Sequence, residues 1–394
     1  MTDESVSAIF FFMSHIKSPA VEFTTTGDDS EIKPQGPLRY GWTTGACAAA
    51  AAKAAFSALL NGEFPDPVSI TLPRGQTPAF ALAKHTLSAT SATAGIIKDA
   101  GDDPDVTHGV LVHVTVQRRQ AGSGLLFCAG EGVGTVTRAG LPVAPGEPAI
   151  NPGPRAMIQR ALTEVAASKN NVALDLSITI AIPGGEKIAQ KTLNPRLGIV
   201  GGLSVLGTTG VVVPYSCSAW IHGIHRGIDV ARAAGLSHVA GATGSSSEDA
   251  VAAYHNLPEI ALIDMGDFVG GMLKYLRKHP VPRVTIAGGV AKITKLAQGF
   301  LDLHSRRGRV DLQALAETAR INGADNTLRL QIEHANTTAE AFALATQASI
   351  DLGTAIAAAA KVTAGHVVAN TPIDLEVLLF DRTGQQVGHA PFSH

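Results

Sequence analysis

Two threonine–glycine turns carry side chains whose types and spacing suggest chemistry. GWTTGACAAAAAKAA, from Gly41 to Ala55, puts Thr43 and Thr44 before an alanine-rich helix, and VLGTTGVVVPYS puts Thr208 and Thr209 before a second predicted helix. A threonine hydroxyl can cap the free N–H groups of a first helical turn, and the same helix end attracts anions. The turns are therefore either caps or parts of an anion site. The small alanines would let a backbone or a flat ligand come close.

Aspartates crowd the segment KDAGDDPDVTHG, which contains Asp99, Asp102, Asp103 and Asp105. Carboxylates on a loop can bind a hard cation, but this spacing does not match the EF-hand loop. A turn held by hydrogen bonds from the aspartate side chains is a structural alternative. In a third interpretation one carboxylate, Asp103 foremost, is a base or hydrogen-bond acceptor towards a substrate. We expect no protein-bound metal.

Two basic segments are candidates for carboxylate binding. A long glycine- and proline-rich loop contains Arg138 and ends at Arg155, near the start of a predicted helix, and HSRRGR contains His304, Arg306 and Arg307. An arginine guanidinium can bind a carboxylate through two hydrogen bonds. A long loop inside a compact domain is often functional, and an ordered surface loop is the alternative for the segment with Arg138. For HSRRGR the alternative is that the charged side chains are simply solvated at the surface.

The composition indicates a globular, enzyme-like α/β protein. The chain has 394 residues, 45% hydrophobic residues, 41 glycines and a formal net charge of -2. This charge gives no reason to expect a nucleic-acid or membrane-surface binder. The cysteines Cys47, Cys128 and Cys217 are far apart and form no CxxC pair, so we expect neither a disulfide framework nor a cysteine zinc site. A reducing cytoplasm is the expected location.

The chain is expected to contain two domains after a loosely ordered extension over residues 1–35. Residues 36–195 mix strand-like alternation with two helices, which predicts an α+β domain. Residues 196–394 repeat a short apolar run, a glycine-containing turn and an amphipathic helix. Repeated βα units predict a Rossmann-like parallel sheet, with ligands at the carboxyl ends of its strands. No segment reads as a membrane span.

Polar residues follow the predicted strands of this second domain. ATGSSSE places Gly244 and serines at a helix start, and IDMGDF places Asp264 and Asp267 after a strand. An acidic side chain at such a position can bind the ribose diol of a nucleotide. Neither G-x-G-x-x-G nor the phosphate-binding GxxxxGK[ST] loop is present, which disfavours a dinucleotide and argues against ATP or GTP bound through a P-loop.

Six segments together resemble the cobalt-precorrin-5B carbon-1 methyltransferases of anaerobic cobalamin biosynthesis. In chain order they are LRYGWTTGACAAAAAKAA, KDAGDDPDVTHG, GEGVGTVTRAGLPVAPGEPAINPGPR, LSVLGTTGVVVPYS, MGDFVGGML and AKITKLAQGFLDLHSR. The similarity runs from about residue 38 to 309. PYSCSAW departs from the family pattern, which favours an acidic residue after the serine. Each motif is modest, but six in the same order are specific.

The resemblance implies S-adenosylmethionine as methyl donor and a cobalt-containing tetrapyrrole as acceptor, methylated at carbon 1 to give cobalt-precorrin-6A. We assign donor binding to the strand ends of the second domain: Thr243, Gly244, Ser245, Asp264, Gly266 and Asp267. We assign acceptor binding to Thr43, Thr44, Gly45, Arg138, Arg155, Thr208, Thr209, His304, Arg306 and Arg307. Asp103 is the candidate base; in the alternative, the electron-rich macrocycle is nucleophilic enough to need none.

Two other function classes remain open on the sequence alone. The βα units also suit a nicotinamide-dependent oxidoreductase, although the missing fingerprint disfavours it. A carrier of corrinoid intermediates would bind the tetrapyrrole without chemistry and without dependence on S-adenosylmethionine. A homo-oligomer is possible, and no nucleic-acid or membrane partner is expected.

Overall fold

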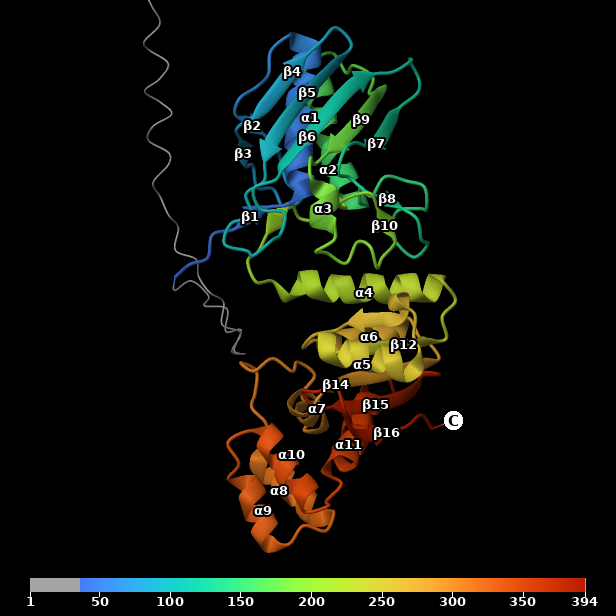
Figure 1. Ribbon diagram of the computed structural model, residues 1–394. Helices are drawn as coiled ribbons and strands as arrows, with labels where there is room; N and C mark the ends of the chain where they lie inside the picture. Colours follow the sequence, from blue (N-terminus) through green and yellow to red (C-terminus); the bar gives the residue numbers. More distant parts are fainter. Residues whose placement is uncertain (1–35, 394) are drawn as a thin grey trace, which may run out of the picture. The chain divides into compact units, whose positions relative to one another are not determined.

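The computed structural model describes residues 36–393, and the predicted extension over residues 1–35 lies outside them. The first core contains these elements: β1 (Gly41–Trp42), α1 (Thr44–Asn61), β2 (Val68–Ser69), β3 (Ala79–Phe80), β4 (Lys84–Leu87), β5 (Ser91–Ile97), β6 (Leu111–Arg118), β7 (Leu125–Ala129), β8 (Thr135–Val136), α2 (Pro152–Ala167), β9 (Leu176–Ala181) and α3 (Gly185–Ala189). Figure 1 shows α1 and α2 beside the main sheet.

The main sheet of this core has the strand order β4-β5-β6-β9-β7. The neighbours are antiparallel except β7 and β9, which run parallel. Along β6 and β9 buried and half-buried residues alternate. Since successive side chains of a strand point to opposite faces, one face supports the core and the other is partly accessible. The predicted α+β character is confirmed.

Helix α1 lies in the middle of this core, which explains its alanines. It packs against α2 and against strands β5 and β6, and its alanines from Ala46 to Ala58 are at most 1% exposed. A helix covered on all sides is apolar around its whole circumference. Small side chains let it approach both the sheet and α2 closely.

Residues after the predicted boundary at 195 still pair with the first core. Strand β10 (Ile199–Val200) pairs with β8, and β11 (Val211–Val212) pairs with β1. The second apolar core begins in α4 (Cys217–Ala233), which starts where the sequence predicts a helix. The division at residue 195 therefore stays a prediction, and strand pairing places residues up to Val212 with the first core.

The second core contains α4 and the following elements: β12 (His238–Ala242), α5 (Ser245–His255), the 3-10 helix η1 (Glu259–Ala261), β13 (Leu262–Asp264), α6 (Val269–Lys278), β14 (Arg283–Gly289), α7 (Val290–Ala297), α8 (Leu312–Ile321), α9 (Asn326–Glu333), α10 (Thr338–Gln347), α11 (Leu352–Val367), β15 (Asp374–Phe380) and β16 (Gln386–Ala390). The three predicted βα units are β12–α5, β13–α6 and β14–α7. Their positions confirm the pattern.

The second sheet has the order β13-β12-β14-β15-β16, with β16 the antiparallel edge strand and the others parallel. The chain order thus reverses beside β12, because the next strand lies on one side of it and the third lies on the other. This is the doubly wound order with a single reversal rather than the six-stranded dinucleotide order. A ligand crevice is expected at the carboxyl ends of β12 and β14.

Helices cover both faces of this sheet. Residues of α5 pack on one face with Ala240 and Leu378, whereas α4, α6, α7 and α11 contribute to the apolar core on the other. Helices α8, α9 and α10 pack on one another, and α10 contacts α7. Within residues 36–393, no helix combines the length and the apolar character needed to cross a membrane.

The amino-end half of the second sheet is closed by a buried polar network. The Glu376 carboxylate, on a residue that is 2% exposed, bonds Thr285 Oγ1 at 2.7 Å and His389 Nε2 at 2.9 Å. His255 Nε2 lies 2.5 Å from the same carboxylate. Burial lowers the pKa of the adjacent His238 to about 4. Buried polar groups are stable when their hydrogen bonds are satisfied, so this network is part of the second core.

We expect Ala50→Leu to destabilise the first core by about 1–3 kcal/mol, because added methylene groups have no space at a position that is 0% exposed. Urea unfolding followed by the fluorescence of Trp42, in a Trp220→Phe background, measures the change. Ala156→Leu, at an exposed position of α2, is the matched control. Equal midpoints for the two variants would contradict the close packing of α1.

Candidate functional site

The candidate site is the carboxyl edge of the second sheet, where three strand ends meet. Thr243 to Ser245 follow β12, Gly288 and Gly289 end β14, and Asp264 ends β13. The N–H of Thr243 donates to the Ala287 carbonyl at 3.0 Å. A Cβ at Gly288 would lie 2.8 Å from Thr243 Oγ1. Glycine is therefore required for β12 and β14 to come together at this edge.

Lys292 joins two of these strand ends. Its ammonium donates to the Thr243 carbonyl oxygen at 2.7 Å and lies 3.1 Å from Asp267 Oδ1. The lysine comes from the first turn of α7, directly after β14. One side chain thus connects the segments that follow β12, β13 and β14, and a fixed positive charge lies at the reversal of strand order.

Two glycines leave open space at the same edge. Added Cβ atoms at Gly244 and Gly289 would meet no atom within 4 Å. Gly244 is the N-cap of α5 and provides no side-chain cap, and Ser245 and Ser246 after it are exposed. Free N–H groups and the helix dipole at such an end favour an anionic or polar ligand group.

Asp264 contributes a half-buried carboxyl group to this edge. Burial, followed by the nearby Glu248 carboxylate, raises its pKa above the usual range. Glu248 is held by the Arg196 guanidinium, with N–O distances of 2.9 and 2.7 Å. A carboxyl group without water on all sides can accept strong hydrogen bonds from a ligand when it is ionised.

Trp220 of α4 places an aromatic ring at the turn after β13. Its indole Nε1 donates to the Asp264 carbonyl oxygen at 3.1 Å, and the residue is 49% exposed. Gly266 has φ 51° and lies against the ring, so that a Cβ there would be 3.2 Å from the indole. The ring is therefore oriented by a hydrogen bond while much of it remains accessible for stacking.

A loop over residues 298–311 borders the same edge. Its ends are joined because Gln298 and Asp311 exchange hydrogen bonds of 2.8 and 2.9 Å. Its first part is attached to the residues after β13, because Gly270 N donates to the Leu301 carbonyl and Leu303 N donates to the Asp267 carbonyl. The basic segment HSRRGR thus lies close to the strand-end residues.

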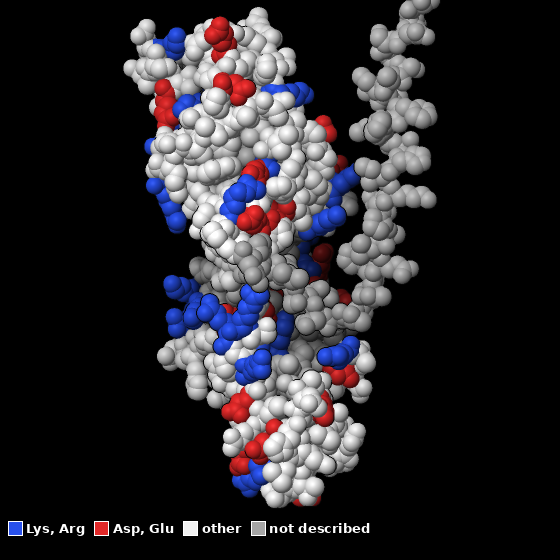
Figure 2. Space-filling view, turned by 90° about the vertical axis from the view of Figure 1, so that its left-hand side faces the viewer, with Lys and Arg blue, Asp and Glu red and all other residues white. Residues whose placement is uncertain are grey.

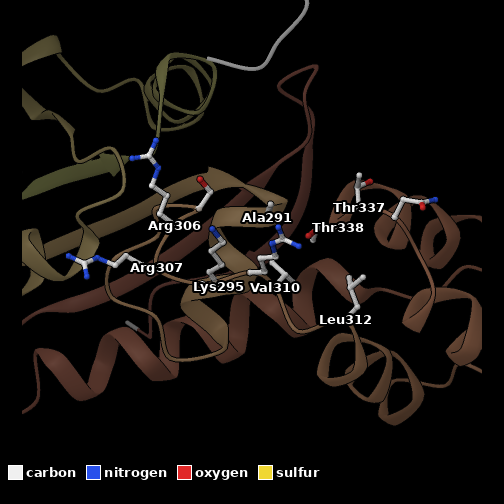
Figure 3. A pocket seen from close by; sticks show the side chains of 12 residues that line it. Ala291, Lys295, Arg306, Arg307, Val310, Leu312, Thr337 and Thr338 are labelled. Atoms are coloured by element: carbon white, nitrogen blue, oxygen red, sulfur yellow. The ribbon is translucent and has the colours of Figure 1, made fainter. Parts of the chain in front are cut away.

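This loop, α7 and the start of α10 line an open pocket of about 940 Å³, which we call the α7 cavity. Its lining residues are Ala291, Lys295, Ser305, Arg306, Arg307, Gly308, Arg309, Val310, Leu312, Asn336, Thr337 and Thr338. Figure 3 shows Ala291 and Lys295 on α7, with Thr337 and Thr338 on the facing segment. The volume is in the range of small-molecule sites. His304 does not line the cavity, and its Nδ1 accepts the Arg306 N–H at 3.1 Å.

The threonine–glycine turns of the first core are joined to each other. Thr43 caps α1 by accepting the Ala46 N–H at 3.1 Å, and its own N–H donates to the Gly210 carbonyl. Thr44 Oγ1 accepts the Leu206 N–H at 3.1 Å, and Gly45 N donates to the Leu206 carbonyl. These contacts supply the structural cap that the sequence allows. Acceptor binding by the turns stays a prediction.

The second turn has a similar internal role. Thr209 Oγ1 accepts the Val211 N–H at 3.3 Å, whereas Thr208 is exposed. A Cβ at Gly207, whose φ is 118°, would lie 2.3 Å from Thr43 Oγ1. Glycine at this position therefore lets the two turns pack against each other.

Arg138 and Arg155 both donate to backbone carbonyls of the first core. Arg138 donates to the Arg196 carbonyl at 2.8 Å. Arg155 donates to the Ile150 carbonyl at 2.8 Å and to Glu147 at 3.0 Å. These bonds hold the glycine-rich loop in place, so the predicted carboxylate binding by the two arginines remains a prediction.

The aspartate loop is also internally paired. Asp103 Oδ1 accepts the Tyr215 N–H at 2.8 Å, and Asp105 accepts from the buried Lys98 ammonium at 2.7 Å. Asp99 pairs with Arg39, whose backbone N–H donates to Asp102. Among residues 36–393, no group of three or more metal-ligating side chains is placed to hold an ion. The assignment of Asp103 as a base stays a prediction.

Four residues of the candidate site were missed by the sequence interpretation: Trp220, Lys292, Lys295 and Arg309. Lys292 and Lys295 lie in the first and last turns of a predicted helix that directly follows a strand, which is a usable signal. Arg309 belongs to the HSRRGR segment. Trp220 lacks such a signal, because only the packing of α4 brings its ring to the turn after β13.

The two cores and this edge define a two-core α/β protein whose second sheet reverses its strand order at β12, with a basic pocket near that edge. The chain belongs to the CbiD family: the family profile matches residues 31–214, and the profile of the CbiD C-terminal domain matches residues 302–391. The predicted family is therefore confirmed.

Known relatives are similar over nearly their whole length. The cobalt-precorrin-5B C(1)-methyltransferase of Halorhodospira halophila is 64% identical over 90% of this chain and 94% of its own. That of Agrobacterium fabrum is 60% identical over 89% and 92%. A 1.9 Å crystal structure of the cobalamin biosynthesis protein cbiD from Archaeoglobus fulgidus is 27% identical, covers 69% of this chain and 84% of that chain, and has a TM-score of 0.38.

We expect Lys292→Met to destabilise the second core by about 1–2 kcal/mol, because the Thr243 carbonyl loses its donor and Asp267 loses its partner. Thermal unfolding followed by Trp220 fluorescence, in a Trp42→Phe background, measures the effect. Lys274→Met, at an exposed position of α6, controls for the removal of a surface charge. If the two variants unfold at the same temperature, Lys292 does not join the strand ends.

Proposed function

We propose that the protein transfers a methyl group from S-adenosylmethionine to carbon 1 of cobalt-precorrin-5B, which gives cobalt-precorrin-6A. The similarity to cobalt-precorrin-5B C(1)-methyltransferases, at up to 64% identity over 90% of the chain, carries this proposal. The carboxyl edge of the second sheet supports it, because a crevice at the reversal of strand order is where doubly wound proteins bind nucleotide-like ligands.

The strand-end residues fit the parts of S-adenosylmethionine. The Asp264 carboxylate can accept hydrogen bonds from ribose hydroxyl groups, and the exposed Trp220 ring offers a surface for the adenine. The open space at Gly244 and Gly289 leaves room beside the free N–H groups of α5. Thr243, Ser245, Gly266 and Asp267 complete this proposed donor site.

The bound donor supplies an electrophilic methyl group on a sulfonium. The ring carbon provides the electron pair of the new bond, and the departing sulfur keeps the pair of the old one. The protein must hold the two reactants in line and exclude water, which can lower the barrier by roughly 7–11 kcal/mol. Asp103, the predicted base, lies in the first core, so this transfer is proposed to depend mainly on positioning.

Acceptor binding is proposed for the basic segment beside the donor site, where Arg306 and Arg307 belong to the α7 cavity. Carboxylates around a tetrapyrrole match guanidinium groups. Thr43, Thr44, Gly45, Arg138, Arg155, Thr208, Thr209 and His304 remain further candidates for acceptor contacts.

Methyl-labelled S-adenosylmethionine and the cobalt-precorrin-5 intermediates, incubated anaerobically with the purified protein, test the proposal. We expect one labelled methyl group on ring carbon 1, read by product mass and label position. Tetrapyrrole binding without label would instead indicate a carrier. Stabilisation by a nicotinamide cofactor but not by S-adenosylmethionine would indicate an oxidoreductase.

We expect Asp264→Asn to weaken S-adenosylmethionine binding about tenfold in calorimetry, because charge-assisted hydrogen bonds are lost. Burial raises the pKa of Asp264, so the wild-type affinity should fall as the pH is lowered towards that pKa, whereas the variant should lack this dependence. Asp249→Asn, at an exposed position of α5, is the matched control. Unchanged affinity in Asp264→Asn would remove this residue from the donor site.

A further inference from the structure

The α7 cavity is strongly positive for a chain whose net charge is -2. Its lining includes Lys295, Arg306, Arg307 and Arg309, and none of the described residues that line it is Asp or Glu. Figure 2 shows Lys and Arg side chains gathered on one face of the molecule. Concentrated charge of one sign raises the local concentration of ligands of the opposite sign.

The arginines of the cavity differ in their existing partners. Arg307 Nε lies 3.3 Å from Asp302 Oδ2, and Figure 3 shows the side chains of Arg306 and Arg307 both directed away from Thr337 and Thr338. Arg306 and Arg309 form no ion pair with any acidic side chain of residues 36–393. Two guanidinium groups are therefore available to a ligand.

Lys295 adds a buried ammonium group. The residue is 8% exposed, and its Nζ donates to the Leu303 carbonyl at 2.8 Å. An ammonium has three donors, and this is the one hydrogen bond of the Lys295 side chain within residues 36–393. Burial lowers its pKa. An anion in the cavity would offset this cost of burying a charge.

Contacts within the loop fix the backbone from which the arginines extend. Gly308 lies against the Phe300 ring, and a Cβ there would be 2.4 Å from a ring carbon. The mutual hydrogen bonds of Gln298 and Asp311 close the loop. A loop that is already shaped loses less conformational entropy on binding. The backbone that carries Arg306 and Arg309 is thus fixed, and their exposed side chains extend from it.

Part of the wall of the α7 cavity is apolar. Ala291 of α7, Val310 and Leu312 supply apolar atoms, and Val310 and Leu312 also pack on the second core. On the facing segment, Thr337 caps α10. Asn336 Nδ2 donates to the Glu340 carboxylate, and Glu340 is not among the residues that line the cavity. Acetate and propionate side chains combine apolar methylene groups with a carboxylate, which matches this mixture.

We propose that the α7 cavity binds carboxylate side chains from the rim of the tetrapyrrole acceptor, through Arg306, Arg309 and Lys295. The identity of the acceptor rests on the proposed function. A phosphate group is also anionic, but a pocket of about 940 Å³ with apolar walls suits several alkyl carboxylates better than one compact ion. Lys295 and Arg309 thereby become specificity-determining residues for a carboxylate-rich ring.

Titration with uroporphyrin, a carboxylate-rich tetrapyrrole, tests this inference in the absence of S-adenosylmethionine. We expect the double variant R306Q/R309Q to bind uroporphyrin at least about tenfold more weakly, because charge-assisted hydrogen bonds are lost. Both residues are exposed, so the variant should fold, and its melting temperature checks this. R277Q, an exposed arginine on α6 outside the cavity, should bind like the wild type.

Two further measurements separate this inference from the proposed function. Mesoporphyrin, which has fewer carboxylates, should bind more weakly, and its affinity should depend less on Arg306 and Arg309. Equal affinity of R306Q/R309Q and R277Q for uroporphyrin, or full displacement of uroporphyrin by equimolar pyrophosphate, would overturn the inference while leaving methyl transfer intact. A loss of uroporphyrin binding in R306Q/R309Q would support the inference even if the labelling experiment failed.

Discussion

The reversal of strand order beside β12 is the constraint on which the candidate site depends. Strands β13 and β14 lie on opposite sides of β12, so the segments that leave these strands diverge at their carboxyl ends, where doubly wound sheets bind their ligands. Gly288 permits the close approach of Thr243, and Lys292 ties Thr243 to Asp267. These contacts fix the strand ends relative to one another at this edge of the sheet.

The two cores differ in which of their polar side chains are hydrogen-bonded within the fold. In the first core, Thr43 and Thr44 bond the neighbouring backbone and Asp103 bonds the Tyr215 N–H. In the second, Ser245 and Arg309 keep polar groups accessible at one edge. Since buried polar groups are normally satisfied within a fold, the groups left available mark where a ligand can bind. The first core also keeps two such groups, because the buried ring nitrogens of His113 have no hydrogen-bond partner among the described residues.

Much of the second fold could be predicted because local patterns determine it. The runs around β12, β13 and β14 are apolar, end in glycine-containing turns and precede amphipathic helices, so both the elements and their parallel pairing follow. The role of Trp220 could not be predicted, because it depends on how α4 packs. The role of Thr43 could not be predicted either. Its hydroxyl can cap a helix or contact a ligand, and the surrounding residues determine which of the two it does.

The central claim is that the methyl donor binds at the carboxyl edge of the second sheet. Hydrogen-exchange mass spectrometry with and without S-adenosylhomocysteine, the demethylated donor, tests it directly. The account predicts slower exchange in the segments that follow β12 and β13, which include Ser245 and Gly266, with little change around Thr44. Protection confined to the threonine–glycine turns of the first core would contradict it.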